Sequence, residues 1–262
     1  MKIIAIIQAR LGSTRLPGKV LFDLEGKTVL EHVIRRVKSS KLVTDVIVAT
    51  TINKEDLKIV KLCANLGISV YCGPDDDVLD RYYQTARLFK ADHVVRITSD
   101  CPLIDPMVID EVITLHVREK ADYTSNTIKE TYPDGEDIEV FTFAALKEAW
   151  KKATLSSERE HVTPFIRKNH ALKLVNLEFN RDLSHKRWTM DNPEDYEFIK
   201  SLYKNIYNKN PDFGMEEILK FIDKNPDIEK INQNINRNEG YLKSLKEEKT
   251  LNLEDIEEHS NG

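Results

Sequence analysis

The strongest constraint on the fold is a regular alternation of apolar runs and helix-type patterns through the first 110 residues. Each run is short and bounded by polar or glycine positions, as expected of a buried strand, and the segments between runs carry apolar side chains at helical spacing. Strand–helix repeats of this kind build a parallel sheet covered on both faces. We therefore predict a mostly parallel, three-layer α/β/α sheet, with strands at 3–7, 46–50, 68–72 and 94–98 and helices beginning near Thr28, Asn53, Asp77 and Pro106.

The first predicted strand runs directly into a loop rich in glycine and positive charge. The loop contains Gly12, Ser13, Gly18, Arg10, Arg15 and Lys19. Glycine lets backbone N–H groups approach phosphate oxygens, and cations neutralise their charge. The loop is neither a Walker A motif, because G-x-x-x-x-G-K-S/T is absent, nor G-x-G-x-x-G. We predict a polyphosphate-binding loop of another type; a βα turn with surface cations is the alternative.

The second half of the chain is less regular. Strands are predicted at 138–141 and 172–177, and helices near 143–152, 158–168, 194–207 and 215–224. The sequence contains no internal repeat and no Pro/Gly-rich linker. We predict one domain over residues 1–245, followed by a polar, mobile C-terminal tail at 246–262, where acidic residues accumulate.

Composition excludes several classes of protein. The chain has 262 residues, of which 40% are hydrophobic and 32% charged, with a net charge of −5. The negative balance argues against a nucleic-acid partner, which usually binds basic proteins. No apolar run approaches the roughly 20 residues needed to cross a bilayer, so we expect no membrane insertion. The start of the chain has no signal-peptide pattern, and Cys63, Cys72 and Cys101 lack metal-site spacing. A cytoplasmic protein with free thiols is the expectation.

Two aspartates are candidate metal ligands. Asp100 follows the strand at 94–98, at the edge where open α/β sheets bind ligands. Magnesium takes one or two carboxylates together with phosphate oxygens, so a second carboxylate should come from elsewhere in the chain. Asp191 is the candidate, although Asp-Asn-Pro-Glu is by itself an ordinary helix start. The alternative for Asp100 is that it only caps the next helix.

The loop carries a resemblance to a known family. The segment Ala9-Arg10-x-x-Ser13-x-Arg15-Leu16-Pro17-Gly18-Lys19 resembles the nucleotide-binding signature of the cytidylyltransferases that activate acidic sugars. These include 3-deoxy-manno-octulosonate cytidylyltransferase, CMP-N-acetylneuraminate synthetase and, most similar, the group of spore coat polysaccharide biosynthesis protein SpsF. The resemblance spans nearly the whole chain. It implies the Rossmann-like nucleotide-diphospho-sugar transferase fold, CTP as substrate, Mg²⁺ as cofactor and a homodimer.

The resemblance also implies roles for the nucleotide-binding and metal-binding residues. The stretch from Arg96 to Pro102 resembles the family segment R-x-x-G-D-x-P, with Ser99 in place of Gly, and makes Asp100 a metal ligand. The stretch from Asp191 to Asp195 resembles D-T-P-E-D, and makes Asp191 the second ligand. The catalytic set is then Arg10, Arg15, Lys19 and Asp100, and the nucleotide-binding set adds Gln8, Ala9, Gly12, Ser13 and Arg81.

Acceptor binding is assigned to the second half of the chain. The segment from Pro133 to Glu139 resembles the SpsF pattern P-D-G-x-D-x-E, and Asp137 and Glu139 share one face at strand spacing. A charged edge strand is the alternative. The remaining predicted acceptor contacts are Asn126, Arg159 and His161.

The sequence thus predicts a Mg²⁺-dependent nucleotidyltransferase, with CTP or another NTP as donor and an acidic sugar or phosphorylated acceptor. By resemblance, an acceptor oxygen attacks the α-phosphorus, pyrophosphate leaves, and the product feeds surface glycan synthesis. No general base is obvious. A glycosyltransferase of the same architecture is the first alternative, although a D-x-D pair after the central strand is missing because Cys101 and Pro102 follow Asp100. A non-catalytic nucleotide-binding protein is the second.

Overall fold

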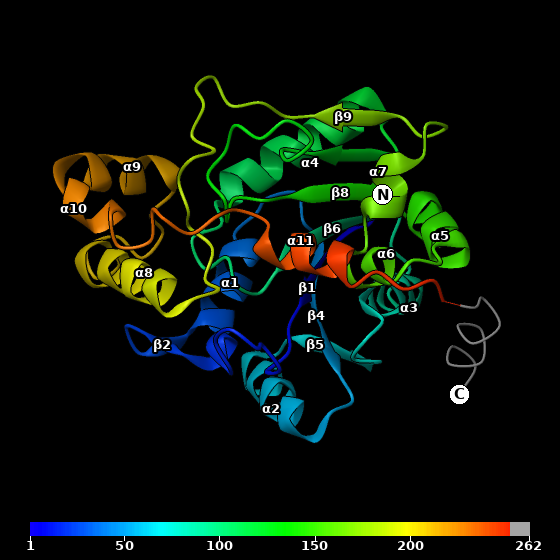
Figure 1. Cartoon of the computed structure of the whole chain (residues 1–262), viewed down its shortest axis with the longest axis horizontal. Coiled ribbons are helices and arrows are strands. Elements are labelled where there is room, and N and C mark those ends of the chain that lie inside the picture. Colours follow the sequence, from blue (N-terminus) through cyan, green and yellow to red (C-terminus); the bar gives the residue numbers. More distant parts are fainter. Residues whose placement is uncertain (252–262) are drawn as a thin grey trace.

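A seven-stranded sheet forms the central layer of the computed structural model, which describes residues 1–251 (Figure 1). Its strand order is β5-β4-β1-β6-β8-β7-β9, and only β8 runs against the other six. The bounds are β1 (Ile3–Gln8), β4 (Asp45–Thr51), β5 (Ser69–Gly73), β6 (His93–Thr98), β7 (Tyr123–Ser125), β8 (Glu139–Thr142) and β9 (Leu174–Asn176). The four predicted parallel strands, and the mostly parallel three-layer fold, are confirmed.

Helices cover both faces of the sheet because both faces of β1 are apolar. Ile3, Ala5 and Ile7 pack into one core, while Ile4 and Ile6 pack into the other. The first core lies under α1 (Val29–Lys38), α2 (Leu57–Leu66), α4 (Pro106–Glu119), α8 (Pro193–Ile206), α9 (Met215–Lys224) and the short α10 (Pro226–Glu229). The second lies under α3 (Val78–Leu88), α5 (Phe143–Lys152), α6 (Ser156–His161) and α7 (Pro164–Lys168).

Side-chain caps fix where two of the predicted helices begin. The Thr28 hydroxyl accepts a hydrogen bond from the Glu31 backbone N–H at 3.1 Å and caps α1. The Asp77 carboxylate accepts from the Asp80 N–H at 2.8 Å and caps α3. Short elements complete this half: η1 (Lys19–Leu21), the hairpin β2 (Asp23–Leu24) and β3 (Lys27–Thr28), and η2 (Lys54–Asp56).

The structure differs from the predicted elements in three places. The helix expected at 158–168 is two helices, because Val162 has φ +70° and Pro164 has no N–H to continue the first one. Asn53 precedes η2 rather than capping α2 with its side chain. A helix that was not predicted, α11 (Glu239–Lys246), forms within the polar C-terminal segment.

The predicted mobile tail lies mainly outside the described residues. Its described part pairs with the loop before α6: the Ser156 N–H donates to the Lys249 carbonyl at 2.8 Å, and the Leu251 N–H donates to the Thr154 carbonyl at 2.7 Å. Residues 252–262 are not described, so the mobility of the tail stays a prediction.

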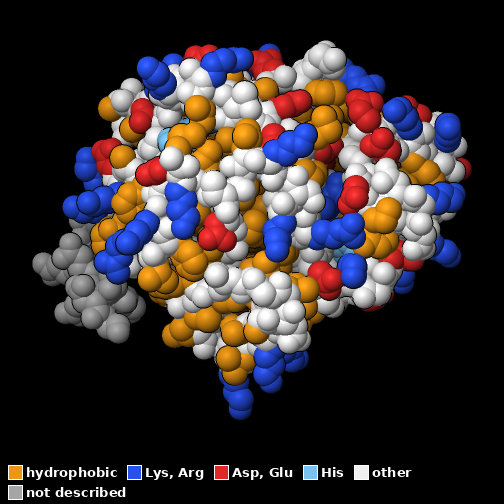
Figure 2. Space-filling view, turned by 180° about the vertical axis from the view of Figure 1, so that it is seen from behind, with side chains coloured by type: hydrophobic (Ala, Val, Ile, Leu, Met, Phe, Trp, Pro, Cys, Tyr) orange, Lys and Arg blue, Asp and Glu red, His pale blue; other side chains and the backbone are white. Residues whose placement is uncertain are grey.

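No helix among the described residues is long and apolar enough to span a membrane. Figure 2 shows one face of the molecule, on which Lys and Arg are interspersed with Asp and Glu rather than gathered into one cationic surface. This face therefore lacks the electrostatic footprint typical of nucleic-acid binding.

Candidate functional site

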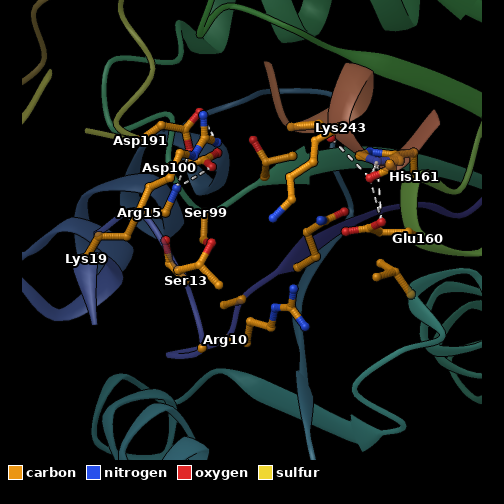
Figure 3. Close-up of a pocket in the computed structure, with 18 of the residues that line it drawn as sticks. Arg10, Ser13, Arg15, Lys19, Ser99, Asp100, Glu160, His161, Asp191 and Lys243 are labelled. Atoms are coloured by element: carbon orange, nitrogen blue, oxygen red, sulfur yellow. Dashed lines mark hydrogen bonds and ion pairs between the residues drawn. The ribbon is translucent and has the colours of Figure 1, made fainter. Parts of the chain in front are cut away.

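A cavity of about 750 Å³ opens beside the carboxyl ends of β1 and β6. Parallel pairing brings Gln8 next to Thr98, so the loops that follow these strands meet there. The cavity is lined by the loop after β1, Ser99 and Asp100 after β6, Asp191 before α8, the end of α6, and α11. Figure 3 shows the loop cations and the two aspartates on one side, with Glu160, His161 and Lys243 on the other.

The cationic loop has a defined shape. The Leu11 carbonyl accepts hydrogen bonds from the backbone N–H groups of Ser13 (2.9 Å) and Gly18 (3.0 Å), which closes the loop on itself. Gly18 has φ +72°, a backbone conformation that glycine adopts at little cost. Leu16 is buried in the core, so the loop is anchored while Gly12, Ser13 and Arg15 line the cavity.

Lys19 joins the two predicted metal ligands. Its ammonium donates to Asp100 Oδ2 at 2.8 Å, to Asp191 Oδ1 at 2.7 Å and to the Met190 carbonyl at 2.8 Å. Burial works against the charged ammonium, but both carboxylates outweigh it and hold the pKa of Lys19 above its ordinary value. Burial likewise opposes ionisation of Asp100, and Lys19 holds the pKa of that carboxyl below its ordinary value. The pair predicted from distant parts of the sequence is thus brought together.

The other two loop cations also have carboxylate partners. Arg15 pairs with Asp191 at 2.9 Å and with Glu239 of α11 at 3.3 Å. Arg10 pairs with Asp75 at 2.6 Å, on the loop before α3. Arg10 and Arg15 both line the cavity, so an anionic ligand would compete with these carboxylates for the same cations.

Two side chains at the cavity, Gln8 and Arg81, have buried polar atoms that lack partners among the described residues. Gln8 Oε1 and the Nε and Nη1 atoms of Arg81 are buried without a hydrogen bond. Arg81 is 2% exposed, and burial, followed by the positive charge of Arg10, lowers its pKa. Unpaired buried groups cost free energy, so an acceptor and two donors left open at one cavity indicate a polar ligand.

Four of the five predicted acceptor contacts do not line the cavity. Glu139 accepts from Arg96 (2.5 Å), from the Tyr123 hydroxyl (2.6 Å) and from Thr163 (2.6 Å). Its lone pairs are therefore used inside the fold. Asn126 bridges the backbone by donating to the Glu136 carbonyl at 2.6 Å and accepting from the Ile138 N–H at 2.9 Å.

Arg159 is similarly used within the fold. It is 1% exposed and donates to Asp77 at 3.0 Å and to the Trp150 carbonyl at 2.7 Å. Asp137 does not line the cavity either, and its carboxylate pairs with Arg237 at 2.5 Å. Acceptor contacts by these residues stay predictions to which the geometry adds no support.

His161 does line the cavity, together with residues that sequence reasoning missed. Its Nε2 lies 2.9 Å from the Ser244 hydroxyl, which donates to Glu160 at 2.7 Å. Burial lowers the pKa of His161 below its ordinary value, so the imidazole is neutral near pH 7. Glu160 lies beside His161 in sequence and could have been found there, whereas Ser244 and Lys243 belong to the unpredicted α11.

The donor set fits a hard divalent cation. Asp100 and Asp191 present carboxylate oxygens on either side of one ammonium group, at a site that is about one-fifth exposed. Among residues 1–251, no group of three or more His, Cys, Asp or Glu side chains is arranged to hold a metal. Two carboxylates suit Mg²⁺, which takes its remaining ligands from phosphate and water.

The fold and the cavity together define a nucleotide-handling α/β protein, with a cationic loop after the first strand and a carboxylate pair beside it. Comparison with known proteins makes the class specific. The family model described as Cytidylyltransferase matches residues 4–222. The chain belongs to the cytidylyltransferase family and is a nucleotidyltransferase.

Individual relatives agree with this assignment. The chain is 35% identical to spore coat polysaccharide biosynthesis protein SpsF of Bacillus subtilis, over 86% of this chain and 95% of that protein. A solved cytidylyltransferase from Leptospira borgpetersenii matches with a TM-score of 0.84 and 35% identity, covering 90% of this chain and 98% of that one. The 3-deoxy-manno-octulosonate cytidylyltransferase of Trichlorobacter lovleyi is 40% identical over 43% of this chain and 44% of its own length. The predicted resemblance is confirmed.

Proposed function

We propose that this protein transfers a cytidylyl group from CTP to an oxygen of an acidic sugar or related acceptor and releases pyrophosphate. The observation that carries the proposal is that Lys19 of the cationic loop binds both Asp100 and Asp191, so a phosphate-binding loop and a carboxylate pair meet at one site. A glycosyltransferase takes a nucleotide sugar, which carries no free triphosphate, and it would therefore have less need for a loop with three cations. SpsF's name in polysaccharide biosynthesis supports a role in surface glycan synthesis.

Each part of the cavity has a task in this reaction. Arg10, Arg15 and Lys19 bind the phosphates and offset the charge that develops on the leaving pyrophosphate. Gln8 Oε1 and Arg81 offer an acceptor and donors, which suit the mixed hydrogen-bonding edge of a cytosine base. Asp100 and Asp191 would hold Mg²⁺, which when bound supplies charge neutralisation at the phosphate.

We propose that the acceptor binds on the far side of the cavity. His161 and Glu160 face the loop cations across it and can accept hydrogen bonds from acceptor hydroxyl groups (Figure 3). Such contacts would hold the attacking oxygen in line with the α-phosphorus, and positioning of this kind carries much of the rate in phosphoryl-type transfer. The cytoplasmic location remains a prediction from the sequence, and the homodimer remains a prediction from the family resemblance.

The test is pyrophosphate release with each of the four NTPs and Mg²⁺, against a panel of acidic sugars, sugar phosphates and phosphonates. We expect release with CTP and one acceptor, and a CMP adduct as product. Asp100→Asn should lower turnover by about 100-fold or more, whereas Asp223→Asn, a control on the exposed side of α9, should not change it. Transfer from nucleotide sugars, with no release from any NTP, would refute the proposal.

A further inference from the structure

Helix α11 lies outside the residues that the family model matches, yet it forms one wall of the cavity. The family match ends at residue 222, and α11 begins at Glu239. Glu239, Gly240, Lys243 and Ser244 all line the cavity. Figure 1 shows α11 beside α6, in front of the sheet, so the C-terminal segment folds back over the site.

The segment is attached on both sides of the cavity. On one side, Arg237 donates to Asp137 at 2.5 Å and to the Tyr132 carbonyl at 3.3 Å, next to the loop before β8. On the other side, Ser244 contacts His161 and Glu160 of α6, and the Leu251 N–H donates to the Thr154 carbonyl. The chain between these attachments therefore spans the cavity as a cover.

One cation of the cover, Lys243, differs from the loop cations because it has no carboxylate partner in the part of the chain that the structure describes. The loop cations Arg10, Arg15 and Lys19 are already paired with carboxylates of this chain. Lys243 points its ammonium group into the cavity (Figure 3), and among residues 1–251 no ion pair or hydrogen bond engages that group. An anionic ligand would therefore meet Lys243 without first displacing a carboxylate.

The position of Lys243 along α11 indicates which anion it meets. Gly240 lies one turn earlier on the same face, and a Cβ atom at that position would be 3.7 Å from Arg15 Nη2. Glu239, its neighbour, holds Arg15 at 3.3 Å. A phosphate group that replaced the Glu239 carboxylate on Arg15 would therefore lie beside the face of α11 that carries Lys243.

We propose that Lys243 binds the β- and γ-phosphates of the nucleotide, and that α11 is a cover that completes the triphosphate site. The proposal rests on the proposed function, because it takes CTP as the ligand. It adds a substrate-binding residue from a segment outside the family-matched region. The leaving pyrophosphate would then be contacted by the cover as well as by the loop.

The first test is equilibrium binding of CTP and of CMP, each with Mg²⁺, measured calorimetrically without any acceptor. Lys243→Gln should weaken CTP binding about tenfold, because one charge-assisted contact to phosphate is lost. CMP binding should change less than twofold, because CMP lacks the β- and γ-phosphates. The matched control is Lys246→Gln, an exposed lysine of the same helix that does not line the cavity, and it should bind both nucleotides as the wild type does.

The possible outcomes separate the two proposals. If the wild-type protein binds CTP and Lys243→Gln binds it equally well, the role of Lys243 is refuted while the proposed function stands. Equal weakening of CTP and CMP also refutes it, because the contact would then be to the α-phosphate or the nucleoside. If the wild-type protein binds no nucleotide, both proposals fail.

The second test addresses the cover itself. In hydrogen exchange on the wild-type protein, CTP should slow exchange of the backbone amides of 239–246 by more than CMP does, because only the triphosphate links the cover to the loop. Unchanged exchange of this helix with saturating CTP would refute the cover.

Discussion

Replacement of Lys19 by methionine tests the central feature of the site, which is one ammonium group shared by two carboxylates. The Lys19 side chain is 9% exposed, and it pairs with Asp100 and Asp191 at 2.8 and 2.7 Å. Methionine keeps the length and apolar stem of the side chain but removes the charge. Lys19→Met therefore leaves both carboxylates without their shared cation, and it also removes the hydrogen bond to the Met190 carbonyl.

The cost follows from where the carboxylates lie. Removing one partner of a fully buried ion pair costs about 3–5 kcal/mol, and an exposed pair contributes about 0–1 kcal/mol. Asp100 and Asp191 are about one-fifth exposed, which places this site between the two limits. Asp191 also keeps Arg15 at 2.9 Å and Arg187 at 3.4 Å, so Asp100 bears most of the loss. We expect the free energy of unfolding to fall by about 2 kcal/mol.

The assay is urea unfolding at neutral pH with and without 10 mM Mg²⁺. In the variant, the two carboxylates are free to bind a divalent cation, so Mg²⁺ should restore about 1.4 kcal/mol, as expected for a dissociation constant near 1 mM. The wild-type protein should gain less, because Lys19 competes for the same oxygens. Lys27→Met, which removes an exposed i,i+4 pair with Glu31, is the control and should cost about 0.5 kcal/mol or less. Equal losses in the two variants, or equal gains from Mg²⁺ in variant and wild type, would refute the reasoning.

Two further predictions concern parts of the fold that support the site. His116 is 1% exposed, and burial, followed by the positive charge of His93, lowers its pKa to about 4. As the pH falls, His116 is protonated in the unfolded chain near its ordinary pKa of about 6.5, but in the folded protein only near pH 4. The free energy of unfolding therefore falls between about pH 6.5 and pH 4. Unfolding at pH 7.5 and pH 5 should show that the wild type loses about 2 kcal/mol more than His116→Gln, and parallel losses would contradict this. Gly135 has φ +115°, and a Cβ there would lie 2.6 Å from the Trp188 backbone carbon. Gly135→Ala should therefore lower the free energy of unfolding by about 2–3 kcal/mol, and a thermal midpoint within 2 °C of wild type, roughly a loss of under 1 kcal/mol, would show that the loop relaxes.

The parallel strands and the loop signature could be predicted because their information is local. The apolar runs that form β1 and β4 are buried on both faces of the sheet, which the periodicity already indicates. Gly18 occupies a left-handed backbone position that its residue type favours. Asp100 and Asp191 could be paired only through the family resemblance, since no local pattern links two residues so far apart in sequence.

The acceptor half could not be predicted in the same way. Glu139 and Arg159 have the charge and spacing of ligand-binding residues, but the fold uses both as buried counter-charges, for Arg96 and Asp77 respectively. Sequence shows that a charge is present and not which neighbour will neutralise it. Helix α11 was missed because its residues are mostly polar and its stability depends on contacts with α6 and Arg15, which only the tertiary structure brings near.

The arrangement of charge in the cavity has a consequence for how its ligands bind. Six Lys and Arg side chains and five Asp and Glu side chains line it, so the empty cavity is close to neutral and gives little long-range attraction for a triphosphate. A triphosphate that takes Arg15 and Lys19 leaves Asp100 without its cation and Asp191 with Arg187 alone. Those carboxylates then need another positive charge, because uncompensated carboxylates at a partly buried site are costly. We therefore expect nucleotide binding to raise the affinity of the carboxylate pair for a divalent cation, and by linkage we expect the cation to raise the affinity for the nucleotide to the same extent.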